Sequence, residues 1–408
     1  MSATPDAVRP GVLSKAQLVK DLSWSRTPYL STAIAVALLA IIPLVWRNDY
    51  VISLLTLIFI YSIMTQSWNI TIGFCGIWNF GQLAIIALGG YAAGLLNTKL
   101  GINPWLGLPA GMIAGGISAV IMVLPSIRLR GIYASMLTFA FAEVVRLLII
   151  ADNTGFTGGP FGVTGIDGLF SGLSPRGSLR AYFWLTLVVS AGIMLLMHRM
   201  MTSPFGMGLV SQRESIRFSI GMGINRRVLF VAATLISGVI GGLAGALYAT
   251  FYTTILPTVM GLAPMGLLVT MVVVGGLGTV RGPIVGTFLV MIISELLRDT
   301  VMWRLVVQGA ILLLVLAFFP AGVDPLVVRG IRKLKAWMAE EKAGGETAAV
   351  AGQSATAEGP VAEAMASGSA ESSPAKATAS GLAELATKKG GFRAWLNADQ
   401  PPKDDTTS

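Results

Sequence analysis

Two residues of opposite charge lie inside one apolar stretch of this sequence. Glu143 and Arg146 fall within "IYASMLTFAFAEVVRLLII", which is otherwise uncharged and long enough to span a membrane. Each charge would cost about 2.5–3.5 kcal/mol at the centre of such a helix. Because the two residues are three positions apart, their side chains share a helix face and can pair. We expect a structural ion pair that satisfies itself and pins this helix to its neighbours, with a polar element near an outer gate or substrate route as the alternative.

Other side chains suited to chemistry are few. Cys75 is the single cysteine, which excludes an intramolecular disulfide and a cysteine-based metal site. His198 is the single histidine and precedes Arg199 at a membrane edge, where a solvated side chain is expected rather than a proton relay. The sequence has no G-x-x-x-x-G-K-[ST] phosphate loop. We therefore expect no catalytic residue, no metal site and no cofactor bound by this chain.

The composition is that of a membrane protein. Hydrophobic residues make up 54% of the 408 residues, charged residues make up 12%, and the mean hydropathy is +0.73. A soluble domain is about 25% charged. The runs Tyr50–Thr98, Leu100–Ile127 and Val228–Val280 carry no charge, and a spanning helix needs about 20 apolar residues. The predicted fold class is an all-α polytopic membrane protein.

About ten transmembrane helices are predicted within a membrane domain at 29–323. Their approximate bounds are 29–46, 51–70, 81–96, 104–124, 132–151, 182–198, 228–251, 264–280, 283–297 and 305–319. Residues 1–28 form a polar N-terminal arm without the apolar core of a cleavable signal peptide. Residues 324–408 form a low-complexity tail rich in Ala, Gly, Ser, Glu and Lys, which we expect to be disordered.

The distribution of positive charge predicts the orientation in the membrane. Before residue 324, the connections on the side of the N-terminus carry twelve Lys and Arg residues and those on the other side carry six. Positive residues are enriched on the cytoplasmic side, so both termini are predicted to be cytoplasmic. This placement also explains the net charge of +9 without nucleic acid. The segment 327–342, "VVRGIRKLKAWMAEEK", fits either ordinary positive-inside anchoring or a short helix on anionic lipid.

Small residues and polar interruptions indicate how the helices pack. The segments "ALGGYAAGLL", "AGMIAGGISA" and "ISGVIGGLAGALYA" have small residues four apart, which lets helix backbones approach closely. Asn69–Gln82 and Thr253–Gly266 interrupt the apolar sequence, either as ordinary turns or as backbone that lines a path. The outer loop Asp152–Arg180 is rich in Gly and Thr, and we expect it to contact an external partner or cover the end of the bundle.

The segment "SPFGMGLVSQRESIRFSIGMGINRR" is a polar stretch on the predicted cytoplasmic side. Its apolar spacing predicts a short amphipathic helix over Leu209–Ile224, ended by Gly221 and Gly223. Such a helix could lie on lipid or fit a groove on a cytoplasmic partner. The pattern alone does not choose between these two.

At this segment the chain resembles the permease subunits of branched-chain amino acid ABC importers, of the LivM type. "RESIRFSIGMGIN" is similar to that family's coupling loop, R-E-x-E-I-A-A-x-A-x-G-I-N, although Ile216 replaces the second acid and Phe218–Ser219 replace the Ala pair. The resemblance assigns coupling to Arg213, Glu214, Ile216, Arg217, Gly223, Ile224 and Asn225.

The resemblance covers most of residues 50–323. "GFCGIWNFGQLAIIALGGYAAGLL", "IRLRGIYASMLTFAFAEVVRLLI", "TGGPFGVTGI" and "VVVGGLGTVRGPIVGTFLV" are similar to further family motifs in the same order, with Asn79 and Phe80 in place of the usual Ser-Leu. Candidate path or gate residues are Asn79, Gln82, Thr138, Glu143 and Arg146. Candidate residues for docking a binding protein are Thr157, Gly158, Gly159, Gly162 and Gly165.

The resemblance implies a multi-pass permease in the bacterial inner membrane that moves branched-chain or related amino acids. It implies a second permease subunit, two cytoplasmic ATPases that use ATP and Mg, and a periplasmic substrate-binding protein. A permease for urea or short amides is the alternative within the family. A stand-alone ion-coupled transporter would need acids near the midplane, and Glu143, Arg146 and Glu295 offer little material for it. An intramembrane enzyme lacks the clustered residues that it would need.

Overall fold

The computed structural model describes residues 48–129, 131–215 and 225–298, together with a few single positions near these ranges. The chain divides into two units, Met1–Ile331 and Arg332–Ser408, and the described residues belong to the first. The predicted arm 1–28 and tail 324–408 lie outside the described residues. The predicted spans 29–46 and 305–319 lie mostly outside them as well.

The described residues form the helical bundle that the sequence predicts. Six helices are long and apolar enough to cross a membrane. They are α3 (Asp49–Asn69, continued by the π-helix η1, Ile70–Phe74), α4 (Gln82–Leu100), α5 (Pro104–Ser126), α6 (Ile132–Ile150), α7 (Pro175–Met201) and α10 (Arg226–Tyr252). Two shorter apolar helices follow, α11 (Leu262–Gly275) and α12 (Gly282–Leu296). All eight occupy positions of predicted spans.

Side-chain caps explain where several helices begin. The side chain of Asn48 accepts a hydrogen bond from the Tyr50 backbone N–H, and Asn103 accepts one from Trp105. Ser174 accepts from the backbone of Gly177, and Pro175 then occupies the first position of α7. These residues satisfy backbone donors that a helix start leaves unpaired. The predicted span 182–198 therefore extends to Pro175 at its start.

Helices α4, α5 and α10 pack with their backbones in contact, in agreement with the prediction from small residues. A Cβ atom added to Gly111 of α5 would lie 2.9 Å from the carbonyl oxygen of Gly89 in α4 and 3.0 Å from that of Gly242 in α10. A Cβ on Gly90 would lie 2.9 Å from the carbonyl oxygen of Gly245. Larger residues at these positions would force the three helices apart.

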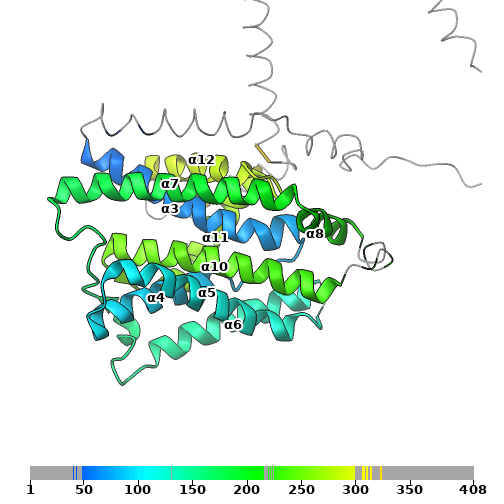
Figure 1. The fold of residues 1–408 in the computed structure, drawn as a ribbon, viewed down its shortest axis with the longest axis horizontal. Helices are drawn as coiled ribbons and strands as arrows, with labels where there is room; N and C mark the ends of the chain where they lie inside the picture. The colour runs from blue at the N-terminus through cyan, green and yellow to red at the C-terminus, as the bar shows by residue number, and fades with distance from the viewer. Residues whose placement is uncertain are drawn as a thin grey trace, which may run out of the picture. The chain divides into compact units, whose positions relative to one another are not determined.

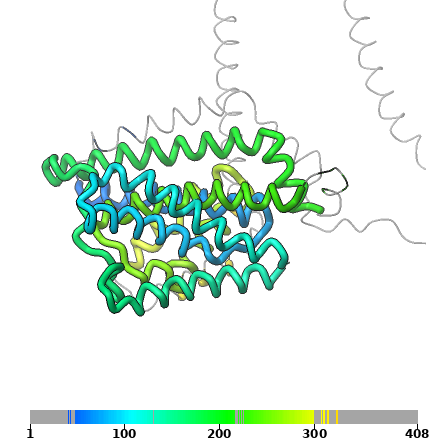
Figure 2. The backbone as a smooth tube through the Cα atoms, turned by 60° about the horizontal axis from the view of Figure 1, so that its bottom comes forward, coloured from blue at the N-terminus to red at the C-terminus, as the bar shows by residue number. Residues whose placement is uncertain are grey.

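The remaining helices are arranged around this trio. Helix α3 packs against α7, α10 and α12, and α11 packs against α12 (Figure 1). Helix α6 contacts α4 and α5 more sparsely. Only 28% of its apolar 18-residue segment is buried, compared with 56% of the corresponding segment of α10. A second view shows α7 and α10 running lengthwise and meeting the short helix α8 (Pro204–Glu214) at one end of the bundle (Figure 2). We call this end the α8 end.

The opposite end carries a short antiparallel ribbon, and we call it the ribbon end. Strand β1 (Val163–Thr164) pairs with β2 (Thr254–Ile255), with Val163 opposite Ile255. A 3₁₀ helix, η2 (Gly159–Phe161), precedes β1, and another, η3 (Pro257–Met260), follows β2. The ribbon joins the α6–α7 connection to the α10–α11 connection. The interruption predicted at Thr253–Gly266 is therefore a paired turn at the end of the bundle.

Replacing Gly242 with Ala tests the close packing of the three helices. The new methyl group would contact the Gly111 carbonyl, so we expect a loss of about 1–3 kcal/mol of stability and a lower melting temperature in detergent. The matched control is Gly192→Ala in α7, where an added Cβ has no atom within 4 Å. This control should melt at or above the wild-type temperature. Equal melting temperatures for both variants would contradict the packing described here.

Candidate transport and coupling site

The connection between α3 and α4 is a buried departure from helical structure. Helix α3 passes into η1, and residues 75–81 then continue without helix or strand until α4 begins at Gln82. Residues 69–75, Asn79 and Gly81 are buried. We call residues 70–81 the break. π-Helical turns are rare and often lie at functional sites, and non-helical backbone at membrane depth requires partners within the protein.

Asn69 joins the break to the turn between α11 and α12. Its side-chain nitrogen donates to the Thr279 carbonyl at 2.8 Å, and its side-chain oxygen accepts from the Gly278 backbone N–H at 3.0 Å. Asn69 is 1% exposed. The amide of the last α3 residue before the break therefore holds the start of the break beside a turn about 200 residues further along the chain.

Asn79, Gln82 and Thr138 form part of a buried polar cluster. The carbonyl of Asn79 accepts from Trp68 Nε1 at 2.6 Å, and the Asn79 amide nitrogen donates to Gln82 Oε1 at 3.4 Å. Gln82 also bonds with Ser67 and Ser237, which connects the cluster to α3 and α10. Thr138 of α6 accepts from the Phe80 backbone N–H at 3.1 Å. These predicted path residues come together, and the contacts they make support the break from within the protein.

Glu143 and Arg146 form the ion pair that their spacing predicts. Arg146 Nε donates to Glu143 Oε2 at 3.0 Å, and a second contact joins the other guanidinium nitrogen to Oε1. Their side chains remain 38% and 27% exposed, respectively. Within the described residues Arg146 donates only to Glu143, so the pair makes no hydrogen bond to a neighbouring helix and does not pin α6 to its neighbours as predicted. It lies farther along α6 than Thr138, toward the ribbon end.

Arg213 extends from α8 into the break. Its guanidinium donates to the carbonyl of Gly73 in η1, at 2.5 Å. An added Cβ on Gly76, whose φ is +72°, would lie 3.0 Å from Arg213 Cγ, so the arginine stem also packs on the backbone there. A Cβ added to Gly278 would overlap Arg213 Nη1, the same nitrogen that bonds to Gly73. One side chain therefore contacts both irregular segments.

The other predicted coupling residues have separate roles in the fold. Asn225 caps α10 by accepting from the backbone N–H groups of Arg227 and Val228, at 3.1 and 3.4 Å. Glu214 is exposed at the end of α8, and Gly223 is exposed with a φ of +78°. Ile216, Arg217 and Ile224 lie outside the described residues.

The predicted single helix over Leu209–Ile224 is wrong. Helix α8 begins earlier, at Pro204, and ends at Glu214, because Ser215 adopts an extended conformation. Leu209 is fully buried against the core, so the apolar residue that suggested the start of a new helix instead packs α8 onto the bundle.

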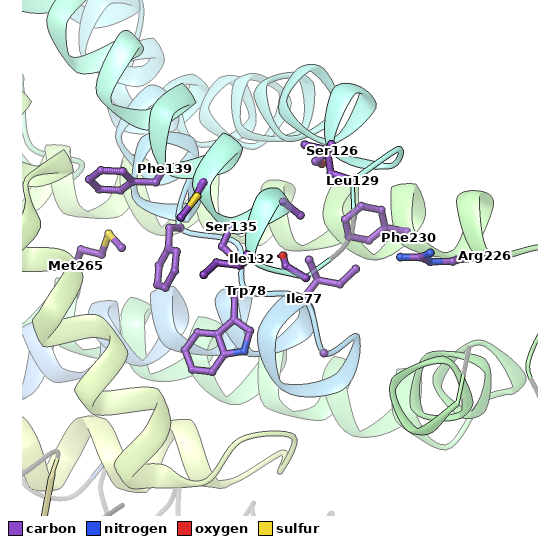
Figure 3. A pocket seen from close by; sticks show the side chains of 15 residues that line it. Ile77, Trp78, Ser126, Leu129, Ile132, Ser135, Phe139, Arg226, Phe230 and Met265 are labelled. Carbon is purple, nitrogen blue, oxygen red and sulfur yellow. Dashed lines mark hydrogen bonds between the residues drawn. The ribbon is translucent and has the colours of Figure 1, made fainter. Parts of the chain in front are cut away.

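A pocket of about 620 Å³ lies between α6 and the break. Its walls come from the break (Gly76, Ile77, Trp78 and Phe80), the first half of α6, Met265 of α11, and Arg226 and Phe230 of α10. Figure 3 shows Arg226 at one end of the pocket, Phe139 and Met265 toward the other, and Trp78 between them. Most of the lining side chains are apolar. Asn79, Gln82, Thr138, Glu143 and Arg146 do not line it.

The Gly and Thr residues of the predicted docking loop are explained by the conformation of its backbone and by its hydrogen bonds. The carboxylate of Asp152 accepts hydrogen bonds from the backbone and hydroxyl groups of Thr154 and Thr157. The Thr154 hydroxyl, together with the hydroxyl and amide of Thr157, holds the pKa of Asp152 well below its usual range. Gly158 and Gly162 have φ values of +77° and +63°, which a side chain would strain. Gly159 and Gly165 also have positive φ values.

Several contacts at this site could not be predicted from sequence motifs. The contacts of Arg213 with Gly73, Gly76 and Gly278 depend on how three distant segments fold together. The pocket residues Trp78 and Phe139 belong to motifs that resemble the family, but apolar residues in a membrane span carry no signal of a cavity. The sequence motifs did not predict the positive φ of Gly76 either.

These features define a class of protein. The described chain is a multi-pass membrane bundle with an irregular, hydrogen-bonded segment in its interior, a pocket beside that segment, and a contact from a short helix at one end. That combination is typical of a transport permease. Residues 50–316 match the family described as "Branched-chain amino acid transport system / permease component", and the chain belongs to this family.

Curated relatives agree with this family. The chain is 27% identical over 300 residues to the "High-affinity branched-chain amino acid transport system permease protein LivM" of Escherichia coli K12, covering 67% of this chain and 70% of that protein. It is 27% identical over 313 residues to the protein of the same description from Salmonella typhimurium, covering 71% and 73%. A "Probable branched-chain amino acid transport permease protein LivM" from Methanocaldococcus jannaschii is 28% identical over 190 residues, covering 38% and 54%. No solved structure matches this chain.

Removal of the Thr138 hydroxyl tests how α6 supports the break. Thr138→Ala would leave the part-buried Phe80 N–H without its acceptor, which costs about 1 kcal/mol. We expect a lower melting temperature and faster hydrogen exchange in the break. Thr138→Ser keeps the hydroxyl and serves as the matched control. If the Ala and Ser variants exchange at the same rate, the bond does not stabilise the break.

The Asp152 loop should keep its structure until the pH is strongly acidic. The folded pKa of Asp152 is lower than the unfolded value of about 4, so its stabilisation is fully present above that value and is lost as the pH falls through the folded pKa. Protection of the Thr157 amide from hydrogen exchange should therefore be constant from neutral pH to about pH 4. Asp152→Asn should reduce this protection at neutral pH. The Ile166 amide, which bonds to Thr253 at 3.1 Å, is the internal control.

Proposed function

We propose that this chain is the permease subunit of an ATP-driven ABC importer that moves branched-chain or related amino acids across the bacterial inner membrane. The family and the descriptions of the relatives support this substrate class. The α8 end would face the cytoplasm together with both termini, in accord with the positive-inside pattern. The ribbon end would face the periplasm.

The contact of Arg213 with the break carries this proposal. In an importer driven from the cytoplasm, a segment outside the membrane must move backbone inside it. Arg213 belongs to α8, whose exposed end residue is Glu214, and its guanidinium bonds to the Gly73 carbonyl. Two cytoplasmic ATPases, using ATP and Mg, would bind at the loop that begins with Arg213 and ends at Asn225. Closure of the ATPase pair would shift α8 and, through Arg213, the break.

The exposed face of α6 supports a second permease subunit as partner. A charged pair that is partly exposed on a membrane span is costly against lipid, even when its charges balance. Glu143 and Arg146 lie on the least buried of the six spans. We infer that this face lies against the partner subunit or the water-filled path between the two subunits. Other exposed apolar faces, such as that of Val188 on α7, would contact membrane lipid.

The ribbon end supports docking of a periplasmic substrate-binding protein. Phe156 and Phe161 of the loop are 58% and 79% exposed, next to the glycines predicted for docking. The loop is held by Asp152 and by the ribbon, so these rings are presented on an ordered surface. Rigid aromatic side chains on such a surface are common in protein interfaces.

Transport in this proposal is a shift between two states of the bundle. ATP binding by the partners can change the balance only if they bind the two states with different affinity. The close packing of α4, α5 and α10 makes this trio a rigid body. The break, α6 and the α11–α12 turn are the elements left to move. Urea or short amides are the alternative transported molecules. A stand-alone ion-coupled transporter is the less favoured alternative class of protein.

Replacement of Arg213 tests the coupling. Arg213→Ala removes a charge-assisted hydrogen bond, worth about 1.5–3 kcal/mol, and we expect ATP-driven leucine uptake in proteoliposomes to fall about tenfold or more. The complex should still assemble with its ATPases and hydrolyse ATP. Arg213→Lys, which cannot contact both irregular segments at once, should fall in between.

The matched control for this test is Arg199→Ala. Arg199 is exposed at the end of α7, away from the break. Its replacement by Ala removes the same charge from the same side of the membrane. We expect wild-type uptake from this control. Wild-type uptake by Arg213→Ala as well would argue against the proposed coupling.

A further inference from the structure

The pocket beside the break carries chemistry that coupling and docking do not use. Its volume of about 620 Å³ falls in the range of about 300–1,000 Å³ that is usual for small-molecule sites. It is larger than one small amino acid needs, so it can admit side chains of different size. Its lining combines a mainly apolar wall with a single cationic side chain at one end.

The cationic end is provided by Arg226. This residue is the first of α10, is half-buried and lines the pocket. The ion pairs found in the described ranges use other residues: Glu143 with Arg146, Asp49 with Arg176, and Glu295 with Arg298. Within those ranges no carboxylate pairs with Arg226. Because a guanidinium is always charged and binds carboxylates with two parallel hydrogen bonds, this end of the pocket suits a carboxylate.

The rest of the pocket suits an apolar side chain. Trp78, Phe139, Met136 and Met265 line it, and methionines adapt to apolar groups of different shape. The two serine hydroxyls of the lining already bond to their own helices, Ser126 to the Val123 carbonyl at 2.8 Å and Ser135 to the Gly131 carbonyl at 3.4 Å. A urea or short amide would lose hydrogen bonds to water here without replacing them.

We propose that this pocket is the binding site of the transported molecule within the permease, and that it selects amino acids with an apolar side chain. The carboxylate would bind Arg226, and the side chain would lie between Trp78 and Phe139. The faces of the aromatic rings on the break side, Trp78 and Phe80, are the groups that can attract the ammonium. This assignment rests on the proposed function and narrows its substrate class.

The same pocket is joined to the coupling contact. Gly76 lines the pocket, and the stem of Arg213 packs on Gly76 while its guanidinium binds Gly73. A displacement of α8 would therefore move the pocket wall directly. The site would be tight in one state of the bundle and open in the other, as release of a cargo requires.

The first test replaces Arg226 in the complete transporter, reconstituted in proteoliposomes with ATP and a saturating amount of substrate-loaded binding protein. Arg226→Gln removes the carboxylate partner, and we expect leucine uptake to fall about tenfold or more. Arg226→Lys should restore part of the rate. The matched control is Arg227→Gln, which removes the same charge from the next, exposed position and should transport like the wild type.

The second test measures selectivity, which a purely structural role would not change. Phe139→Trp narrows the apolar end, and we expect the ratio of leucine to alanine uptake to fall about tenfold, since differences of this size follow from small changes in an apolar pocket. An equal fall for both amino acids would indicate that another molecule, such as a lipid, fills the pocket, and would overturn the proposal. Unchanged rates and ratios in Arg226→Gln and Phe139→Trp would overturn it as well.

The wild-type complex separates this proposal from the proposed function. If the wild type imports leucine but the pocket variants behave like it, only the pocket assignment is wrong. If the wild type imports no branched-chain amino acid, the proposed function is wrong and the pocket assignment falls with it.

Discussion

The structure depends on one constraint: backbone that leaves a helix inside a membrane must find its hydrogen-bond partners within the protein. The break between α3 and α4 meets this requirement with side chains from α3, α4, α6 and α8. Asn69 joins the break to the α11–α12 turn, Thr138 bonds to Phe80, and Arg213 bonds to Gly73. Each supporting residue belongs to an element that could move separately. The break is therefore held in place within the bundle, and in the proposed coupling it would receive the movement of its neighbours.

A contrast in packing decides which elements can move. Helices α4, α5 and α10 meet at Gly89, Gly111 and Gly242, where there is no space for even one additional methyl group. Helix α6 is only sparsely covered, and its contact with the break at Thr138 lies beside the pocket. In the proposed transport cycle, the closely packed trio would be the frame against which α6 and the break shift. The same contrast places the pocket at the border between the fixed and the movable parts.

Much of the fold could be predicted from the sequence because membrane burial leaves a strong signal. Charge-free runs gave most helix positions within a few residues, although α7 begins at Pro175, well before the predicted residue 182. The three segments with small residues four apart belong to helices whose backbones touch. The helix predicted at Leu209–Ile224 was wrong because spacing alone does not show that Leu209 is buried against the bundle. The spacing of Glu143 and Arg146 correctly predicted their pairing. The contacts of Arg213 and the pocket at Trp78 arise from tertiary structure, and no local pattern encodes them.

The pairing of Glu143 with Arg146 has a consequence for the life of the subunit before assembly. Two charges on one helix face that neutralise each other cost less in the bilayer than either charge alone, although the pair stays costly against lipid until a partner covers it. Newly made chains could then persist in the membrane until a partner arrives. A lone acid or a lone base at the same position would instead tie survival of the chain to immediate encounter with a matching charge.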